Sequence, residues 1–171
     1  ETIPGGDGGT TSPAPGTYYY SYGTEVTIGA KPNPGYGFQG WTGSGQYSYT
    51  GTNETATIYT WDNMTETAVF VGLPQPITFS ESGIPSGASV SPALLTVSYT
   101  DLRRNTHTYQ YTPSQLPVTL EIPTGTNVTY SWASPVYGTG SYSGIRYLWK
   151  STTGLATSES GQFTVPAGGG S

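Results

Sequence analysis

The sequence predicts an all-β fold, built as one or two small β-sandwiches of immunoglobulin-like or pilin-like type. Its 15 Tyr, 4 Trp and 4 Phe are spread over 171 residues at short intervals, and such residues suit a pleated, half-buried surface. Its 25 Gly and 14 Pro suit tight turns. No stretch of about a dozen residues without Gly or Pro has helical periodicity. We therefore expect about ten to twelve short strands and no long helix.

In the first part of the chain, residues 1–16 contain a Gly-rich run and a Pro-rich turn, and we expect a flexible arm there. Val26 and Ile28 lie two residues apart, as expected for one face of a strand. Phe38 and Trp41 are expected to anchor the core. The expected strands of this region, 17–72, cover residues 17–22, 25–28, 36–41, 56–61 and 65–71.

The best internal boundary is the Leu73-Pro74-Gln75-Pro76 segment, because its two prolines hold the chain extended and remove backbone donors. We expect a linker at 73–76 and a second β domain at 77–171. Period-two alternation is clear in Val118, Leu120 and Ile122. The strands expected in this domain cover residues 77–80, 94–100, 106–112, 118–122, 128–133, 145–150 and 162–165.

Charge and composition exclude several classes of protein. The net charge is −5 and only 9% of residues are charged. Arg103-Arg104 is the one pair of adjacent cations, whereas nucleic-acid binding requires clustered positive charge. No apolar run approaches the roughly 20 residues of a membrane span. The absence of Cys excludes disulfides and thiol chemistry. We expect no nucleic-acid partner and no membrane span.

The sequence shows no catalytic or metal-binding arrangement. His107 is the single histidine, and the ten carboxylates are scattered without an Asp-x-Asp pattern. Calcium takes six to eight oxygen ligands, mostly from clustered acids. We expect a protein that is not an enzyme, with no catalytic residues, no metal and no cofactor.

Three Asn-x-Ser/Thr sequons begin at Asn53, Asn63 and Asn127, and they use three of the five asparagines. Such sequons accept N-linked glycans in secreted proteins. We therefore expect N-glycosylation and an extracellular, cell-surface location. The alternative is that these residues are ordinary turn asparagines.

Aromatic residues concentrate near the N-terminal end. They could form a platform on which sugars stack, because an aromatic ring combines a large apolar face with a polar tip. The alternative places alternate rings in the core and the others in contacts between subunits. The residues concerned are Tyr18, Tyr19, Tyr20, Tyr22, Trp41, Tyr47 and Tyr49.

Two segments carry a family resemblance. Residues 16–28, 34–43 and 65–70 contain GT…EVTI, PGYGFQGWTG and TETAVF, and this pattern resembles the divergent internalin-B-type repeat of bacterial and archaeal surface proteins. Residues 77–87, ITFSESGIPSG, resemble the opening of β domains in archaeal secreted proteins. Some of those proteins are thermopsin-like proteases that carry the domains as appendages. The resemblance implies an extracellular, β-rich and non-catalytic protein.

From the resemblance to these families, we expect a strand to be missing at each end. A sheet without one of its strands can accept a strand from another copy, and repeated head-to-tail contacts build a filament. We therefore expect a subunit of a surface filament, an archaeal pilus or thread, whose partners are neighbouring copies joined by donor strands. The candidate donors are the favoured N-terminal segment with Glu1, Thr2 and Ile3, and the C-terminal segment with Phe163 and Val165.

Two other functions stay open at this point. One is an adhesin or carbohydrate-binding module. The other is a non-catalytic appendage domain of a larger secreted protein, in which case the chain is a piece of a longer one.

Overall fold

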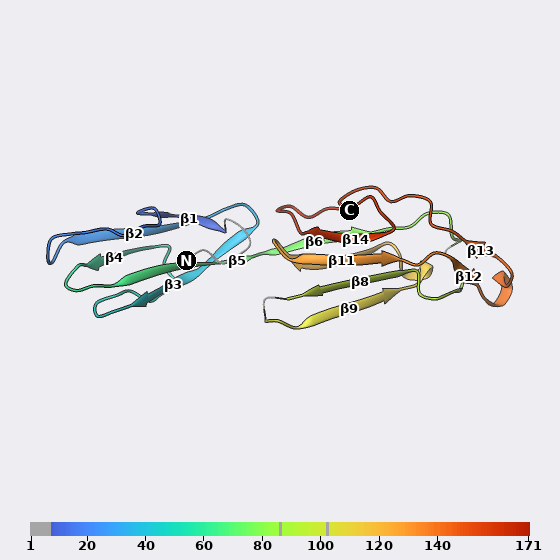
Figure 1. The fold of residues 1–171 in the computed structure, drawn as a ribbon, viewed down its shortest axis with the longest axis horizontal. Coiled ribbons are helices and arrows are strands. Elements are labelled where there is room, and N and C mark those ends of the chain that lie inside the picture. Colours follow the sequence, from blue (N-terminus) through green and yellow to red (C-terminus); the bar gives the residue numbers. More distant parts are fainter. Residues whose placement is uncertain (1–7, 86, 102) are drawn as a thin grey trace. The chain divides into compact units, whose positions relative to one another are not determined.

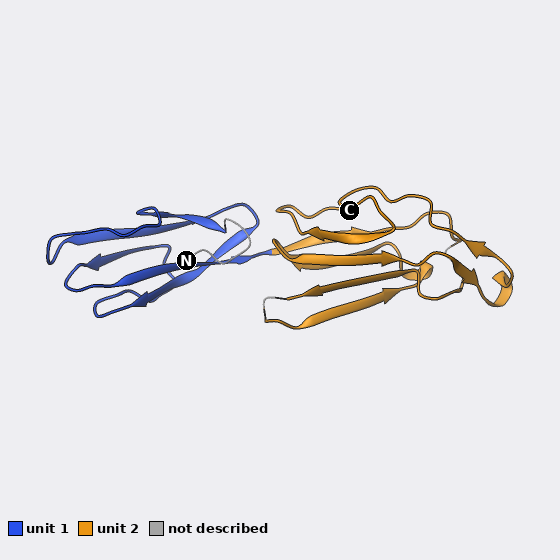
Figure 2. Ribbon diagram, viewed as in Figure 1, with its two compact units in different colours: residues 1–73 blue, residues 74–171 orange. Residues whose placement is uncertain are grey.

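The computed structural model describes residues 8–85, 87–101 and 103–171 and is nearly all β (Figure 1). Strands hold 48% of the residues and helices 4%, so the all-β class is confirmed. Within the described residues the helical segments are two single 3-10 turns, Pro113–Gln115 and Gly140–Tyr142. The chain forms two compact units, 1–73 and 74–171 (Figure 2). The division lies within the segment 73–76.

Unit 1 consists of two antiparallel sheets. Strands β1 (Gly9–Ser12), β2 (Glu25–Pro32) and β4 (Thr55–Tyr59) form one sheet in the order β1-β2-β4. Strands β3 (Tyr36–Ser44) and β5 (Thr65–Gly72) form the other. Alternate residues of these strands point inward and bury one core of Val26, Ile28, Ala30, Trp41, Ile58 and Phe70.

A β-bulge in β3 brings Phe38 and Trp41 to the same face. The pairing of β3 with β5 shifts register between Phe38 and Gly40. Without this extra residue, positions three apart would face opposite sides of the sheet. Gly40 adopts a φ of +156°, a conformation that glycine tolerates well. The two rings meet edge to face with centroids 5.9 Å apart, as expected for core anchors.

The N-terminal region differs from the prediction. The strand expected at 17–22 is wrong, because residues 13–24 form a loop whose tyrosine side chains are exposed. Gly9–Ser12, expected within the arm, pairs with β2 as strand β1. Glu1, Thr2 and Ile3 lie outside the described residues.

Unit 2 has a four-stranded antiparallel sheet. Its order is β14 (Ser160–Thr164), β11 (Asn127–Trp132), β8 (Leu95–Thr100) and β9 (Thr106–Tyr111). A small sheet at one end of the unit comprises β13, β12 and β7. These short strands cover Arg146–Tyr147, Val136–Gly138 and Val90–Ser91.

The second layer of unit 2 is a two-stranded sheet of β6 (Pro74–Phe79) and β10 (Val118–Pro123). The ring of Phe79 on β6 lies 6.4 Å from that of Phe163 on β14, so β6 faces the β14 end of the four-stranded sheet. The core between the layers comprises Ile77, Phe79, Leu95, Val97, Ile122, Val128, Tyr130 and Val165.

The prolines of the expected linker lie inside β6. Thr78 N–H donates to Gly170 C=O at 2.9 Å, and Gly170 N–H donates to Pro76 C=O at 3.0 Å. The backbone N–H and C=O groups of residues 74, 76 and 78 therefore point away from β10. The N–H groups that Pro74 and Pro76 lack would lie on this outer side of β6 and are not part of the pairing with β10. A strand tolerates proline at such positions.

Candidate functional site

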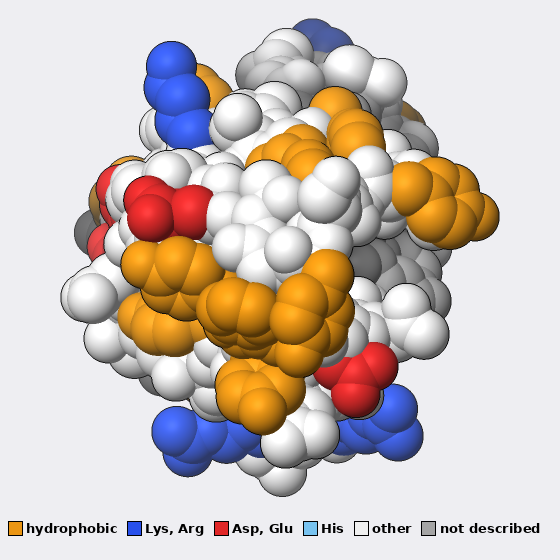
Figure 3. Space-filling view, turned by 90° about the vertical axis from the view of Figure 1, so that its left-hand side faces the viewer, with side chains coloured by type: hydrophobic (Ala, Val, Ile, Leu, Met, Phe, Trp, Pro, Cys, Tyr) orange, Lys and Arg blue, Asp and Glu red, His pale blue; other side chains and the backbone are white. Residues whose placement is uncertain are grey.

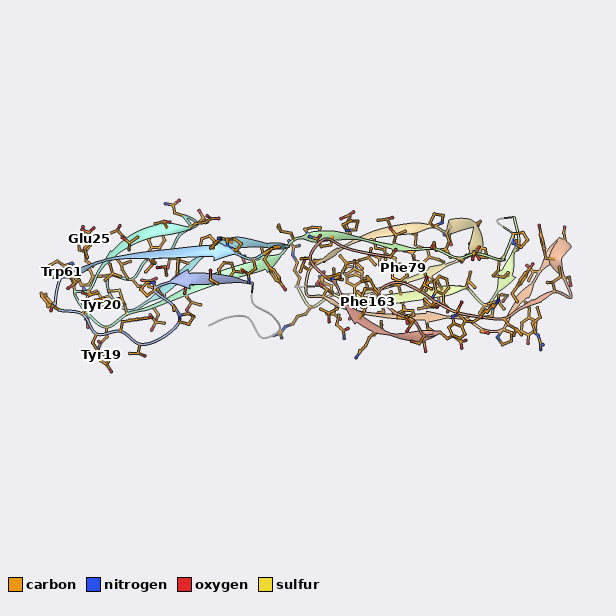
Figure 4. All side chains as sticks on the ribbon, turned by 90° about the horizontal axis from the view of Figure 1, so that it is seen from above. Tyr19, Tyr20, Glu25, Trp61, Phe79 and Phe163 are labelled. Carbon is orange, nitrogen blue, oxygen red and sulfur yellow. The ribbon has the colours of Figure 1, made fainter. Side chains whose placement is uncertain are left out.

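The most distinctive surface is the end of unit 1 where β2 begins and β4 ends. Hydrophobic side chains gather there, with acidic side chains at their margin (Figure 3). Figure 4 shows Tyr20, Glu25 and Trp61 at this same end. We call this surface the aromatic end. Its members are the exposed rings of Tyr18, Tyr19, Tyr20, Tyr22, Tyr47, Tyr59 and Trp61.

Tyr59 and Trp61 form the centre of the aromatic end. They are two residues apart at the end of β4, so they point to the same side of the chain, whereas Ile58 points into the core. Their rings are nearly parallel, at 25°, with centroids 6.5 Å apart. The rings are 45% and 41% exposed. Tyr22 packs edge-on against Trp61, with centroids 4.9 Å apart.

Glu25 supplies a carboxylate beside these rings. It is paired directly with Tyr59 across β2 and β4, and Tyr59 Oη–H donates to Glu25 Oε2 at 3.2 Å. This hydrogen bond, together with the negative charge of Glu25, raises the pKa of Tyr59. A carboxylate accepts several hydrogen bonds, so Glu25 has further acceptor positions.

A shallow, open depression of about 210 Å³ lies next to Tyr59 and Trp61. One wall is the 47–49 loop, and Ser48 and Thr57 contribute hydroxyls. Tyr47 has a φ of +68°, which costs a non-glycine residue about 1–3 kcal/mol and is concentrated at functional sites. The lining residues are Tyr47, Ser48, Tyr49, Thr57, Ile58, Tyr59 and Trp61.

Two residues of the aromatic platform that the sequence predicts, Trp41 and Tyr49, pack against the core instead. Trp41 is only 4% exposed and packs in the core, because the bulge at Gly40 turns it inward. Tyr49 is half-buried and packs against the same core. Tyr59 and Trp61, which sequence reasoning missed, take their place. Their alternation with the apolar Ile58 was the signal that could have found them.

The second notable feature is a row of rings in unit 2. His107, Tyr109 and Tyr111 follow each other at every second position of β9, and Tyr99 on β8 lies beside them. Neighbouring rings stack with centroids 5.0 to 6.4 Å apart. We call these four residues the ring row. Burial raises the pKa of Tyr99 to about 12, with a contribution from Tyr109, and burial raises the pKa of Tyr111.

His107 lies on β9 and also contacts the connection that leads from β8 into this strand. Its Nε2 lies 2.9 Å from Asp101 Oδ2. Asp101 Oδ1 also accepts the backbone N–H groups of Arg103 and Asn105, each at 2.8 Å. The carboxylate therefore organises the connection from β8 to β9.

Residues 2–72 match the family model of the divergent InlB B-repeat domain. B-repeat domains of this kind are typical of surface and extracellular proteins. No curated protein and no solved structure matches the chain. The aromatic end and its strands all lie within the B-repeat match.

The three sequon asparagines have exposed side chains. Asn53 lies just before β4, and Asn63 lies in the turn between Trp61 and β5. Asn127 begins β11 and donates from Nδ2 to Gln162 Oε1 at 3.2 Å. Their glycosylation stays a prediction.

The C-terminal donor candidates are part of unit 2 itself. Phe163 lies in β14 and contacts the rings of Phe79 and Tyr130. Val165 is almost fully buried in the core. Donation of this segment to another copy would require β14 to leave β11.

The described residues contain no cluster of three or more His, Asp or Glu side chains that could hold a metal ion. They also contain no helix that is long and apolar enough to cross a membrane.

Proposed function

We propose that the chain is a non-catalytic structural subunit of an extracellular filament, in which copies join head to tail by strand addition. The observation that supports this most directly is the ring row of unit 2. Its side chains are half-buried on a sheet face that the second layer covers incompletely.

We expect the added strand at the free edge of the second layer of unit 2. β6 faces the β14 end of the four-stranded sheet, and the second layer ends after one more strand, β10. If the strands of the two layers run in similar directions, as in aligned sandwiches, β10 lies opposite the middle strands β11 and β8. Within the described part of the chain, no third strand therefore stands opposite β9. A donor strand paired with the outer edge of β10 would cover the ring row.

The opposite edge of this layer is a poor acceptor. On the outer side of β6, Pro74 and Pro76 offer no N–H group, and the Thr78 N–H is bonded to Gly170. Since strand addition depends on main-chain hydrogen bonds, the edge of β10 is the better choice.

The N-terminal segment is the better donor. Phe163 and Val165 are held in the core of their own unit. Glu1, Thr2 and Ile3 precede β1, the first strand of unit 1, and the Gly5-Gly6 pair could serve as a hinge. Donation by this segment would leave every described strand in place.

Negative-stain electron microscopy and light scattering of the purified full chain test this proposal. We expect filaments or a ladder of oligomers, lost when residues 1–7 are deleted. Tyr109→Lys, which places a charge in the ring row, should also prevent assembly. Gln110→Lys is the matched control, because Gln110 is the next residue and points outward.

Circular dichroism with thermal melting shows whether Tyr109→Lys still folds. Folded monomers of this variant, with assembly retained by Gln110→Lys, support the proposal. It is wrong if the full chain stays monomeric at all concentrations, or if assembly survives deletion of residues 1–7.

A further inference from the structure

The exposed large hydrophobic residues of the aromatic end are all aromatic. Within the described part of unit 1, the exposed large hydrophobic residues are the seven Tyr and Trp residues of the aromatic end together with Leu73. Unit 2, by contrast, exposes Ile145, Leu148 and Leu155 besides Tyr137. Sites for other proteins combine aromatic anchors with well-packed apolar pockets. The aromatic end offers open rings with hydroxyl tips instead.

The rings of Tyr59 and Trp61 are arranged as a platform. Their planes make an angle of 25° with centroids 6.5 Å apart, and both residues are exposed. A ligand made of several linked rings can therefore contact Tyr59 with one ring and Trp61 with another. The face of an aromatic ring carries partial negative charge and attracts C–H groups. The C–H face of a pyranose ring is such a ligand.

Polar groups surround this platform. The Glu25 carboxylate lies at the hydroxyl of Tyr59, and Ser48 and Thr57 line the adjoining depression. An ionised acceptor makes a stronger hydrogen bond with a hydroxyl than a neutral one does. The ring faces and the polar margin together match a molecule with apolar faces and hydroxyl edges.

Charge and depth restrict the ligand further. The sequence of unit 1 contains one cation, Lys31, at the opposite end of β2 from Glu25, so the aromatic end does not attract anions. The depression of about 210 Å³ is smaller than the ~300–1,000 Å³ of pockets that enclose small ligands. The ligand therefore lies across the surface and carries no negative charge.

We propose that the aromatic end binds a neutral oligosaccharide, with sugar rings stacked on Trp61 and Tyr59 and a sugar hydroxyl bonded to Glu25. The 47–49 loop forms a side wall of this site. This site is independent of the ring row and of filament assembly.

Calorimetric titration of the full chain with cellohexaose, chitohexaose, mannohexaose and laminarihexaose tests the proposal. We expect one or more of these sugars to bind. Trp61→Ala and Tyr59→Ala should each weaken that binding about tenfold or more, whereas Trp61→Phe should retain most of it. Glu25→Gln should weaken binding less than the loss of either ring.

Tyr137→Ala is the matched control, since Tyr137 is an exposed tyrosine of unit 2 (52%). The Tyr137→Ala variant should bind the sugar as tightly as the unchanged chain does. Three results would overturn the proposal: no binding to any of the four sugars, equal binding by Trp61→Ala and Tyr137→Ala, or self-association through the aromatic end that Trp61→Ala abolishes.

Discussion

The indole ring of Trp61 lies directly against Gly23. A Cβ atom on Gly23 would come within 2.6 Å of Trp61 Cζ3, closer than real Cβ contacts allow. Gly23 also has a φ of +78°, which glycine adopts without steric cost. Gly23 thus forms the turn into β2 and also leaves the space in which the Trp61 ring packs.

Gly23→Ala should therefore lower the free energy of unfolding of unit 1 by about 2 kcal/mol, since backbone strain of about 1–2 kcal/mol adds to the cost of displacing the exposed Trp61 ring. Chemical denaturation followed by circular dichroism measures this. Gly144→Ala is the control for strain alone, because Gly144 has a φ of +87° but open space around it, and it should cost about 1 kcal/mol. Equal losses in the two variants would show that the contact with Trp61 carries no cost.

Acid should weaken unit 2 through Asp101. The hydrogen bond from His107, followed by that from the Asn105 backbone N–H, lowers the pKa of Asp101 from 3.8 to about 2. A lowered pKa in the folded state gives stability that is present above pH 3.8 and is lost as pH falls through about 2. Melting temperatures between pH 5 and 2 should show this loss. Asp101→Asn should remove that part of the pH dependence, and an unchanged pH profile would contradict the role of the carboxylate.

In unit 1, Glu66 should lower stability at neutral pH rather than at acidic pH. Burial raises its pKa above the ordinary value of 4.5. Its Oε1 accepts the Tyr49 N–H at 2.7 Å, and its buried Oε2 has no hydrogen-bond partner within the described ranges. A raised acid pKa gives stability that is present below pH 4.5 and is lost as pH rises through the folded-state pKa.

Glu66→Gln should therefore raise the melting temperature of unit 1 at pH 7 and change it little at pH 3, because glutamine keeps an acceptor for Tyr49 without a charge. Glu54→Gln, at an exposed position, is the control. A variant that is less stable than the unchanged chain at pH 7 would show that the charge itself is favourable.

The core of unit 2 depends on Leu95, which is fully buried (0% exposed). Leu95→Ala removes apolar contacts and leaves a cavity, so it should cost about 2–5 kcal/mol. Leu148→Ala removes the same atoms from a side chain that is 61% exposed and should change stability by less than about 0.5 kcal/mol. Urea denaturation distinguishes the two, and a loss below about 1 kcal/mol for Leu95→Ala would contradict this core.

Strand content was well predicted where apolar residues alternate, as in Val26 and Ile28 of β2 or Val118 to Ile122 of β10. Prediction failed at the Tyr18–Tyr22 run, because aromatic residues favour strands only where a neighbouring surface covers them. It also missed the short strands β1, β7 and β12. Their two to four residues are too few to show a period.

The all-β class and the absence of thiol chemistry follow from residue types and local alternation, so they could be read from the amino-acid sequence. Which rings are buried and which are exposed depends on how the strands pair. The bulge at Gly40 turns Trp41 inward, and the register of β2 with β4 sets Glu25 beside Tyr59, 34 residues away. Alternation assigns side chains to two faces, but it fixes neither the partner strand nor the register.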